Sequence, residues 1–564
     1  MKDNRKEFYF ILLLSLVCSF FFFFKLGSYK LIDVDEPRYA EAAREMIESL
    51  NWITPYFNYE LRFDKPIFFY WLISASYLIF GVSEFAARLP SAILSTALVF
   101  FTYYFGRTFI SKELGLISGL ILATSLEFIA IGRMSITDMA LTFFICASIF
   151  SGILGSRAEA KNKKIWWWLA YLFAGIAVLT KGPVGVVLPA FILGLYLILA
   201  GKLKESFKLS YIIPGFLIFF TAVIPWYWAI ISEHGNNFIN AFFLKHNLAR
   251  FASSKFGQHH QPFYYYFIVV IAGFFPWTVY FITSLIKYIV EIAAKIKLSA
   301  NRKFDLAYFK DSDNKTLFLL ASIIWFLGVF VFYSASRAKL VTYILPLFPP
   351  MALLTGNLWH EYISEGKNKK IITVSSIILA VICLIMSFVA FFGFNYLLPR
   401  DEKLEFVYIN FVLTAVFIII PVFMLLLLKK NNRIGVFSVK IVLMFAVALT
   451  ALYNILPIVY KAGQADLIEY IAYSKLHNGK LLTYDLMKPS IVFYSKTKII
   501  NISDPNGLKN IISTTEPVFI IVKKSRIGGI PENIRYNIVK KGVRYCLITN
   551  MTIRGKNEID RNGN

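Results

Sequence analysis

Long apolar runs separated by short polar segments dominate the pattern of this chain. They recur up to about residue 457, and each has the roughly 20 residues that a helix needs to cross the hydrocarbon core of a bilayer. We therefore predict a polytopic α-helical membrane protein. Its thirteen expected transmembrane helices are 8–26, 85–106, 115–131, 137–155, 165–180, 183–201, 211–232, 263–287, 316–334, 341–358, 371–394, 407–428 and 435–457.

Basic residues collect in alternate loops between these expected helices. Examples are Lys202 to Lys208, Lys367 to Lys370 and Lys429 to Arg433. Because cytoplasmic loops are enriched in Lys and Arg, we expect a cytoplasmic N-terminus, with the loops 27–84 and 233–262 on the outer side. Membrane topology accounts for the net charge of +25, and nucleic acid is not expected as a partner.

Two segments depart from the pattern of full-length spans. The apolar stretch 66–80 is short for a span, so we expect it to be re-entrant or interfacial. After residue 457 the charge rises, and short strand-like runs at 480–484, 518–522 and 544–548 alternate with helix-like ones. This indicates a transmembrane domain at 1–457 and a small α/β domain at 458–564, which an odd number of spans places on the outer side.

The stretch after the first span is unusually rich in charge. Asp33, Asp35, Glu36 and Arg38 fall within six residues, and Pro37 predicts that a helix begins there. Apolar and charged residues then occupy opposite sides, as in a helix lying on a membrane surface. A helix cap needs a single carboxylate, so we interpret Asp35 and Glu36 as candidates for acid–base work and Arg38 as a phosphate ligand.

Further charges lie at expected outer ends of helices. Lys65 precedes Pro66, Asp138 begins a span, and Lys181 lies in Thr180-Lys181-Gly182-Pro183, where a new helix N-terminus makes an anion site. Snorkelling for Lys65 and a helix-start charge for Asp138 are the alternative interpretations. Ionisable residues at membrane depth are functional candidates nonetheless.

Two outer loops complete the set of candidates. Arg250 follows a His-Asn pair in the loop 233–262, and Arg337, Lys339 and Tyr343 surround the start of the tenth span. We expect the basic residues to line a phosphate-binding cavity, where cations act more strongly than in water. No Walker or Rossmann glycine motif is present, which favours a polyprenyl-phosphate sugar over a nucleotide-linked donor.

Five motifs taken together resemble a known family. They are Asp-x-Asp-Glu-x-Arg-Tyr at 33–39, Asp-Lys-Pro at 64–66, Thr-Lys-Gly-Pro at 180–183, His-Asn-Leu-x-Arg-Phe at 246–251, and Ser-x-x-Lys-Leu-x-Thr-Tyr-Ile-Leu-Pro at 336–346. In this order they are similar to the bacterial aminoarabinose transferases of lipid A. Those enzymes have the GT-C glycosyltransferase architecture and are related to the protein O-mannosyltransferases.

The resemblance implies an inverting glycosyltransferase of the bacterial inner membrane. It would move aminoarabinose or a related sugar from undecaprenyl phosphate to lipid A phosphate on the periplasmic face, where the C-terminal domain would also lie. By position, Asp35 corresponds to the catalytic carboxylate. The residues expected around the cavity are Arg38, Tyr39, Lys65, Asp138, Lys181, Arg250 and Tyr343.

Other interpretations remain open. Family members can hold zinc through a glutamate beside the loop lysine and a histidine in the large periplasmic loop. This chain departs from that pattern, with Asp64 in place of the glutamate and His246 as the nearest histidine, so a divalent metal there is an open alternative. No cofactor is otherwise required. The chain is also compatible with a GT-C enzyme that acts on protein hydroxyls or on another envelope glycan. A flippase or transporter for lipid-linked sugars would use a similar basic cavity.

Overall fold

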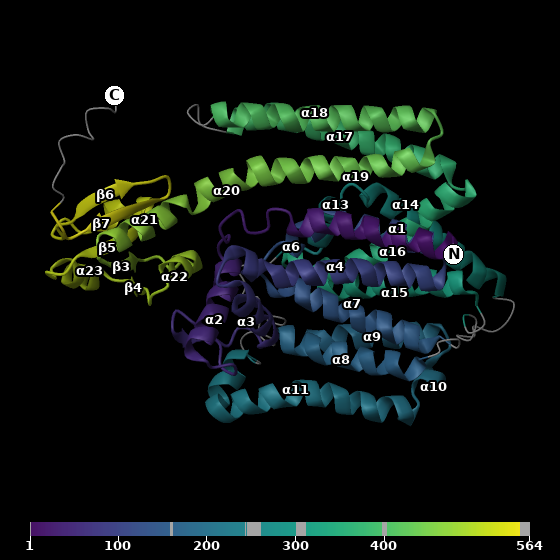
Figure 1. The fold of residues 1–564 in the computed structure, drawn as a ribbon, viewed down its shortest axis with the longest axis horizontal. Coiled ribbons are helices and arrows are strands. Elements are labelled where there is room, and N and C mark those ends of the chain that lie inside the picture. The colour runs from purple at the N-terminus through teal and green to yellow at the C-terminus, as the bar shows by residue number, and fades with distance from the viewer. Residues whose placement is uncertain are drawn as a thin grey trace. The chain divides into compact units, whose positions relative to one another are not determined.

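The computed structural model describes residues 2–157, 162–242, 244, 261–299, 309, 312–397 and 403–552. The chain forms two compact units (Figure 1). The helical unit comprises Met1–Leu26, Phe63–Leu72 and Arg88–Ala451, and the mixed unit comprises Gly27–Arg62, Ile73–Ala87 and Leu452–Asn564. Two helices, α3 (Phe68–Phe80) and α4 (Glu84–Phe109), contribute residues to both.

The helical unit is built from apolar helices, and a helix lies at each of the thirteen predicted spans. Its other helices are α1 (Lys2–Cys18), α5 (Lys112–Ala123), α6 (Leu126–Gly132), α7 (Thr137–Ser156), α8 (Lys163–Lys181), α9 (Val184–Leu199), α10 (Leu203–Ser206), α11 (Leu209–Phe238), α13 (Tyr265–Gly273), α14 (Thr278–Ser299), α15 (Asn314–Ala335), α16 (Phe348–Glu365), α17 (Lys369–Leu397), α18 (Lys403–Lys429) and α19 (Arg433–Thr450). Short π or 3-10 segments of this unit are η1 (Ser19–Phe23) and η5 (Val341–Leu347), while η7 (Ala451–Ile455) falls mostly in the mixed unit.

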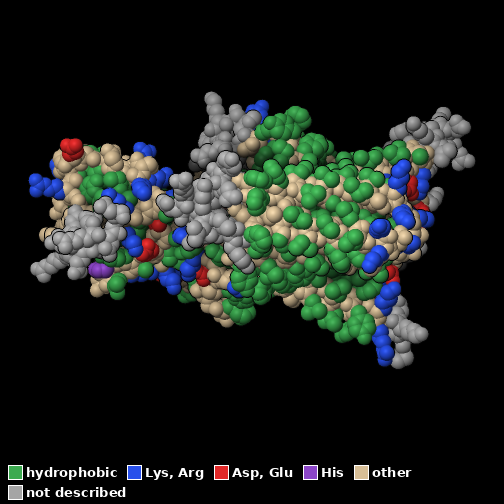
Figure 2. All heavy atoms as spheres, turned by 90° about the horizontal axis from the view of Figure 1, so that it is seen from above, with side chains coloured by type: hydrophobic (Ala, Val, Ile, Leu, Met, Phe, Trp, Pro, Cys, Tyr) green, Lys and Arg blue, Asp and Glu red, His purple; other side chains and the backbone are tan. Residues whose placement is uncertain are grey.

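A polytopic membrane protein is confirmed, whereas the exact number of spans stays a prediction. Within the described residues, nine helices are long and apolar enough to cross a membrane, or up to eleven if each of two bent pairs is one span. The apolar stretch after Pro66 forms α3, which with 13 residues is shorter than those. Figure 2 shows hydrophobic side chains covering one face of the helical unit, with Lys and Arg gathered at one end.

The two bent pairs support each other at their breaks. The pair α5 and α6 bends by 69°, and the pair α13 and α14 by 115°. At the breaks the Leu126 amide donates to the Phe275 carbonyl, and the Trp277 indole N–H donates to Thr124. Backbone groups freed by a break within a membrane need such partners, so these bonds stabilise both bends.

The mixed unit contains a five-stranded sheet in the order β4-β3-β5-β7-β6. Its strands are β3 (Lys480–Tyr484), β4 (Ile500–Ile502), β5 (Val518–Lys523), β6 (Asn537–Lys541) and β7 (Tyr545–Thr549). Its helices beside them are α20 (Leu456–Gly463), α21 (Ala465–Leu476), α22 (Pro489–Ser495) and α23 (Pro505–Ile512), with a 3-10 segment η8 (Lys524–Gly529). The strands β3, β4 and β5 are parallel, and β7 pairs antiparallel with β5 and β6.

Alternation along β5 explains how both faces of this sheet are covered. Phe519 and Ile521 belong to one buried cluster with residues of α21 and α22, while Ile520 and Val522 belong to another with residues of α23. A strand that is buried on both faces has a continuous apolar sequence, and residues 518–522 show this pattern. The predicted α/β fold after residue 457 is therefore present.

Residues 27–62 of the first loop belong to the same unit as this sheet. It contains α2 (Asp35–Ser49) and a hairpin of β1 (Tyr56–Phe57) and β2 (Glu60–Leu61). The Asn58 side chain donates to the Ile499 carbonyl and accepts from the Ile499 amide, at 2.9 and 2.8 Å. Asp33 accepts hydrogen bonds from the Ser490 amide and hydroxyl.

Helix α2 begins at Asp35, two residues before Pro37, as expected from the proline. Its surroundings differ from the prediction of a membrane-surface helix with a solvated charged side. Ala43 and Met46 are fully buried, and so are Glu36 and Glu41 on the charged side. Helix α2 packs against α22, and Ser74 of α3 donates to the Ala43 carbonyl, so protein covers both sides.

Candidate functional site

Three segments of the helical unit meet at a buried carboxylate, Asp138. Asp138 lies in the first turn of α7, Lys181 is the last residue of α8, and Thr342 is in η5. The Lys181 Nζ lies 2.6 Å from Asp138 Oδ1, and the Thr342 hydroxyl donates to the same oxygen at 3.0 Å. The side chains of Asp138 and Lys181 are only 13% and 11% exposed, so the pair is largely shielded from solvent.

Further side chains of the helical unit surround this pair. Lys181 Nζ lies 4.4 Å from the centre of the Tyr343 ring, and Tyr343 lies 5.7 Å from the ring of Tyr333. Lys65 is close enough for its positive charge to interact electrostatically with the Asp138 carboxylate. We call Lys65, Asp138, Lys181, Thr342 and Tyr343 the Asp138 cluster. It combines two cations, one carboxylate and a polarisable ring.

The helix geometry explains how the residues of this cluster are placed. Lys181 precedes Gly182, whose positive φ of 86° ends α8, and Pro183 then leads into α9. A lysine at a helix C-terminus interacts favourably with the last carbonyl groups. The Asp138 carboxylate correspondingly lies at a helix N-terminus, where negative charge is favoured.

Arg337 and Lys339 differ in their environments. Arg337 is exposed, whereas Lys339 is 5% exposed and donates to the carbonyls of Ser336, at 2.6 Å, and Gln261, at 3.3 Å. Burial lowers the pKa of Lys339. Lys339 therefore stabilises the segment that leads into η5, in addition to any contact with a ligand.

The predicted residues at 33–39 of the first loop belong to the mixed unit. The Asp35 side chain is 64% exposed, and Oδ1 lies 4.0 Å from the Arg38 guanidinium. Glu36 is fully buried and accepts a hydrogen bond from the Ile32 amide at 2.9 Å. Tyr39 is buried, with the Arg62 guanidinium 5.5 Å from its ring centre. Of these four residues, Asp35 and Arg38 have the more exposed side chains.

Asp33, one of the three neighbouring carboxylates of this loop, has a structural role. It is held by Ser490, and its own amide donates to the Gln464 side chain at 3.0 Å. Burial raises the pKa of Asp33, and the hydrogen bonds from Ser490 partly offset this. Asp33 and Glu36 thus have structural partners, which leaves Asp35 as the exposed carboxylate of the three.

Two predicted residues, Arg250 and His246, lie outside the described residues. Asp64, the other residue of the metal alternative, is described. Within the described part of the chain, no three His, Cys, Asp or Glu side chains group as a metal site. A zinc ion at Asp64 and His246 stays an open alternative.

Sequence reasoning missed Thr342 and Tyr333 as members of this environment. Thr342 lies beside the predicted Tyr343, so its place in the motif was the available signal. Tyr333 lies nine residues earlier in an apolar helix, and nothing in its local sequence distinguishes it from a core tyrosine.

Comparisons with known proteins agree with this architecture. A family model described as dolichyl-phosphate-mannose-protein mannosyltransferase matches residues 64–228. The crystal structure of ArnT from Cupriavidus metallidurans bound to undecaprenyl phosphate superposes with a TM-score of 0.77 and 21% identity, covering 96% of this chain and 98% of that chain. Such a likeness establishes the fold: the chain is a multi-span membrane protein with the GT-C fold.

Proteins similar in sequence indicate the family to which the chain belongs. An uncharacterised protein of Aquifex aeolicus is 31% identical over 373 residues, which cover 66% of this chain and 77% of that protein. The undecaprenyl phosphate-alpha-4-amino-4-deoxy-L-arabinose arabinosyl transferase of an Enterobacter strain is 29% identical over 341 residues, covering 60% of this chain and 57% of that protein. The chain belongs to the bacterial family of lipid A aminoarabinose transferases. Its match spans 64% of another Aquifex aeolicus relative.

Proposed function

We propose that this protein is an inverting glycosyltransferase of the bacterial inner membrane. It moves a sugar, aminoarabinose or a related amino sugar or hexose, from undecaprenyl phosphate to a phosphate of lipid A on the periplasmic face. The Asp138 cluster is the observation that carries this proposal, because Lys181 contacts a shielded carboxylate where helices end and Lys65 lies within electrostatic range of it. The proposed sugar and its carrier, undecaprenyl phosphate, are those in the names of the similar arabinosyl transferases.

The transfer breaks the bond between the anomeric carbon and the phosphate oxygen of the donor. The bonding electrons go to that oxygen, and undecaprenyl phosphate leaves with an added negative charge. Lys181 and Lys65 stabilise this charge in a site of low exposure, where cations preorganised for the transition state are most effective. Asp138 orients Lys181 through the 2.6 Å contact. The Tyr343 ring, whose centre is 4.4 Å from the Lys181 nitrogen, covers one side of the ammonium group.

An acceptor phosphate oxygen then forms the new bond on the opposite face of the sugar. This oxygen is already anionic, so it needs little deprotonation. We propose that Asp35 orients the acceptor and would act as a base only for a hydroxyl. Arg38, Tyr39, Arg250, Arg337 and Lys339 are proposed to bind substrate phosphates, with Glu36 supporting Asp35.

The remaining parts of the proposal concern domains, topology and metal. We propose residues 1–457 as the catalytic membrane domain and 458–564 as a periplasmic domain, with the N-terminus in the cytoplasm. The basic loops at alternate helix connections support this orientation. No step of the proposed transfer is assigned to a metal at Asp64 and His246.

The test uses the purified full-length chain with undecaprenyl-phosphate aminoarabinose and lipid A in detergent. We expect lipid A to gain the mass of the sugar, and Asp35→Asn to abolish the gain while the protein is produced at the wild-type level. Asp485→Asn, at an exposed ion pair of the sheet domain, serves as the matched control. Product formed in a single compartment distinguishes a transferase from a transporter. Unmodified lipid A with the wild-type protein would refute the proposed acceptor, donor or both.

A further inference from the structure

The side chain of Gln464 binds the backbone of the first loop just before α2. Gln464 lies between α20 and α21, and its Nε2 donates to the Leu31 carbonyl at 2.6 Å. Its Oε1 accepts from the Asp33 amide at 3.0 Å. One side-chain amide thus binds two backbone groups that lie 433 and 431 residues away in the chain.

Two more residues from the C-terminal part of the mixed unit bind the same stretch. The Tyr494 hydroxyl accepts from the Leu31 amide at 2.8 Å. The Ser490 amide and hydroxyl donate to the Asp33 carboxylate at 2.9 and 2.6 Å. Together with the two bonds of Gln464, five hydrogen bonds therefore connect Leu31 and Asp33 to this part of the chain.

The stretch bound in this way ends two residues before Asp35, the first residue of α2. Within the loop, the Ile32 amide donates to Glu36 in the first turn of that helix. Helix α2 itself packs against α22, the helix that carries Ser490 and Tyr494. The backbone is therefore fixed on both sides of Asp35, although the Asp35 side chain is 64% exposed.

The contact between the loop and Gln464 is largely shielded from water. Leu31 and Ser490 are fully buried, and Gln464 is 5% exposed. Buried backbone groups that lose their partner are costly, because water does not readily replace it. Removing the Gln464 amide should therefore release the loop from its fixed position.

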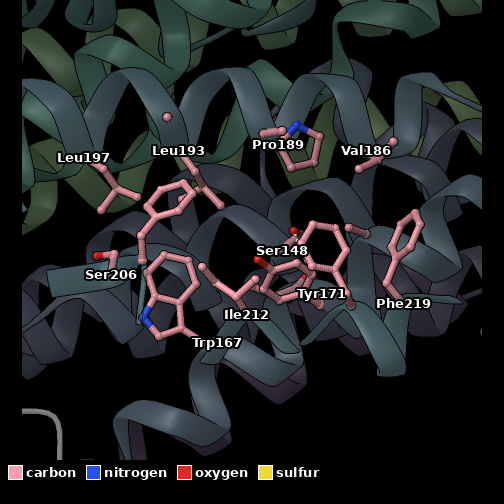
Figure 3. A pocket seen from close by; sticks show the side chains of 16 residues that line it. Ser148, Trp167, Tyr171, Val186, Pro189, Leu193, Leu197, Ser206, Ile212 and Phe219 are labelled. Carbon is pink, nitrogen blue, oxygen red and sulfur yellow. Dashed lines mark hydrogen bonds between the residues drawn. The ribbon is translucent and has the colours of Figure 1, made fainter. Parts of the chain in front are cut away.

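The described part of the helical unit contains a cavity of about 200 Å³ between α7, α8, α9 and α11 (Figure 3). Most of its lining is apolar, and the Ser148 hydroxyl in it already donates to the Ala170 carbonyl. Such a lining suits hydrocarbon rather than a charged group. Asp35 belongs to the mixed unit, so its placement depends on the hydrogen bonds of that unit described above.

We infer that Gln464, Ser490 and Tyr494 are positioning residues for the proposed sugar transfer. They act through the backbone at 31–33 and not by touching a substrate. With this stretch fixed, Asp35 keeps the geometry that transfer requires, and a misplacement of about 1 Å can cost about a hundredfold in rate. The inference rests on the proposed function, in which Asp35 orients the acceptor, and it gives the C-terminal part of the mixed unit a role in the reaction.

The alternative is that these bonds stabilise the mixed unit without affecting transfer. Tyr470 provides a matched comparison, because it is fully buried in the same unit and its hydroxyl donates to the Tyr545 carbonyl at 3.0 Å. Tyr494→Phe and Tyr470→Phe each remove one hydroxyl. The first breaks a bond to the loop, and the second breaks a bond between α21 and the sheet.

The experiment measures kcat, the KM for the donor and the unfolding temperature of the purified full-length chain, with undecaprenyl-phosphate aminoarabinose and saturating lipid A. Gln464→Leu removes both amide bonds, and we expect it to lower kcat by about tenfold or more. Tyr494→Phe should lower kcat severalfold. The KM for the donor should stay within about twofold of the wild-type value, because the donor phosphate is proposed to bind at Lys181. Tyr470→Phe should leave kcat close to the wild-type value.

A second measurement follows the loop independently of activity. Hydrogen exchange of the backbone amides at 31–35 should become about tenfold faster or more in Gln464→Leu, because their folded-state protection is lost. It should be unchanged in Tyr470→Phe. A wild type with slow exchange here but without transfer activity would refute the proposed function, and with it a role of these residues in transfer.

Three results would overturn the inference while leaving the proposed function in place. One is wild-type kcat in both Gln464→Leu and Tyr494→Phe. The second is an equal loss of kcat in Tyr470→Phe and Tyr494→Phe, which would show that the stability of the mixed unit, and not the position of the loop, limits transfer. The third is unchanged exchange at 31–35 in Gln464→Leu.

Discussion

The pairing of Lys181 with Asp138 makes a quantitative prediction about Asp138→Asn. The change removes the negative charge but keeps an oxygen that accepts from Thr342, so shape and one hydrogen bond are preserved. At 2.6 Å and an effective dielectric constant of about 20, the Coulomb attraction lost is about 6 kcal/mol. Desolvation offsets part of that, and removing one partner of a buried pair typically costs about 3 to 5 kcal/mol.

We therefore expect Asp138→Asn to lower the free energy of unfolding by about 3 kcal/mol or more. Transfer should fall by about a hundredfold, because Lys181 loses the group that positions it. The measurements are the unfolding temperature and the rate of sugar transfer by the full-length protein. Asp485→Asn removes a carboxylate from an exposed pair, and its effect on stability should be below about 1 kcal/mol.

A double-mutant cycle separates the pair from other effects of the substitution. In Asp138→Asn/Lys181→Gln both charges of the pair are removed together, so the double variant should be more stable than the sum of the single effects implies. Additive losses, or an unfolding temperature of Asp138→Asn equal to that of the wild type, would refute the reasoning.

Three further predictions concern carboxylates and hydrogen bonds outside this pair. Burial raises the pKa of Glu45 to about 7, so the folded state binds the proton more strongly than the unfolded state, and stability from this group falls as the pH rises from about 4.5 to 7. Glu45→Gln should therefore stabilise the protein at pH 8, by up to about 3 kcal/mol, and little at pH 5; equal effects at both pH values in thermal unfolding would contradict this. Glu127 is 6% exposed, and neither carboxylate oxygen has a partner among the described residues. Glu127→Gln should therefore unfold at the same or a higher temperature than the wild type, and a clear decrease would contradict this. Ser490→Ala removes a hydroxyl that donates to Asp33, so limited proteolysis should cleave the loop 27–62 faster, with Ser513→Ala at an exposed helix end as control; unchanged cleavage would show that this bond does not hold the loop.

The difference between Glu127 and Asp138 shows why burial alone does not identify a functional carboxylate. Both lie in helices of the helical unit and both are largely shielded. Asp138 has Lys181 and Thr342 as partners, whereas Glu127 has none within the part of the chain that the structure describes. The two substitutions should accordingly change stability in opposite directions.

The sequence by itself determined the membrane class, the positions of most helices and the α/β character of the C-terminal residues. The physical reason is that the backbone in a bilayer must satisfy its own hydrogen bonds, so an apolar run of sufficient length predicts a helix without knowledge of its neighbours. Likewise, the strand predicted at 480–484 coincides with β3, because local apolar patterning and turn residues set its ends. Five motifs were enough to indicate the family.

Only the tertiary structure decided which charges are paired. Asp138 and Lys181 are 43 residues apart, and Asp33 and Ser490 are 457 apart. Three carboxylates in the first loop look alike in sequence, yet packing gives Asp33 and Glu36 structural partners and leaves Asp35 exposed. Such contacts depend on how distant segments pack, and hydrophobic periodicity carries no information about which polar groups then meet.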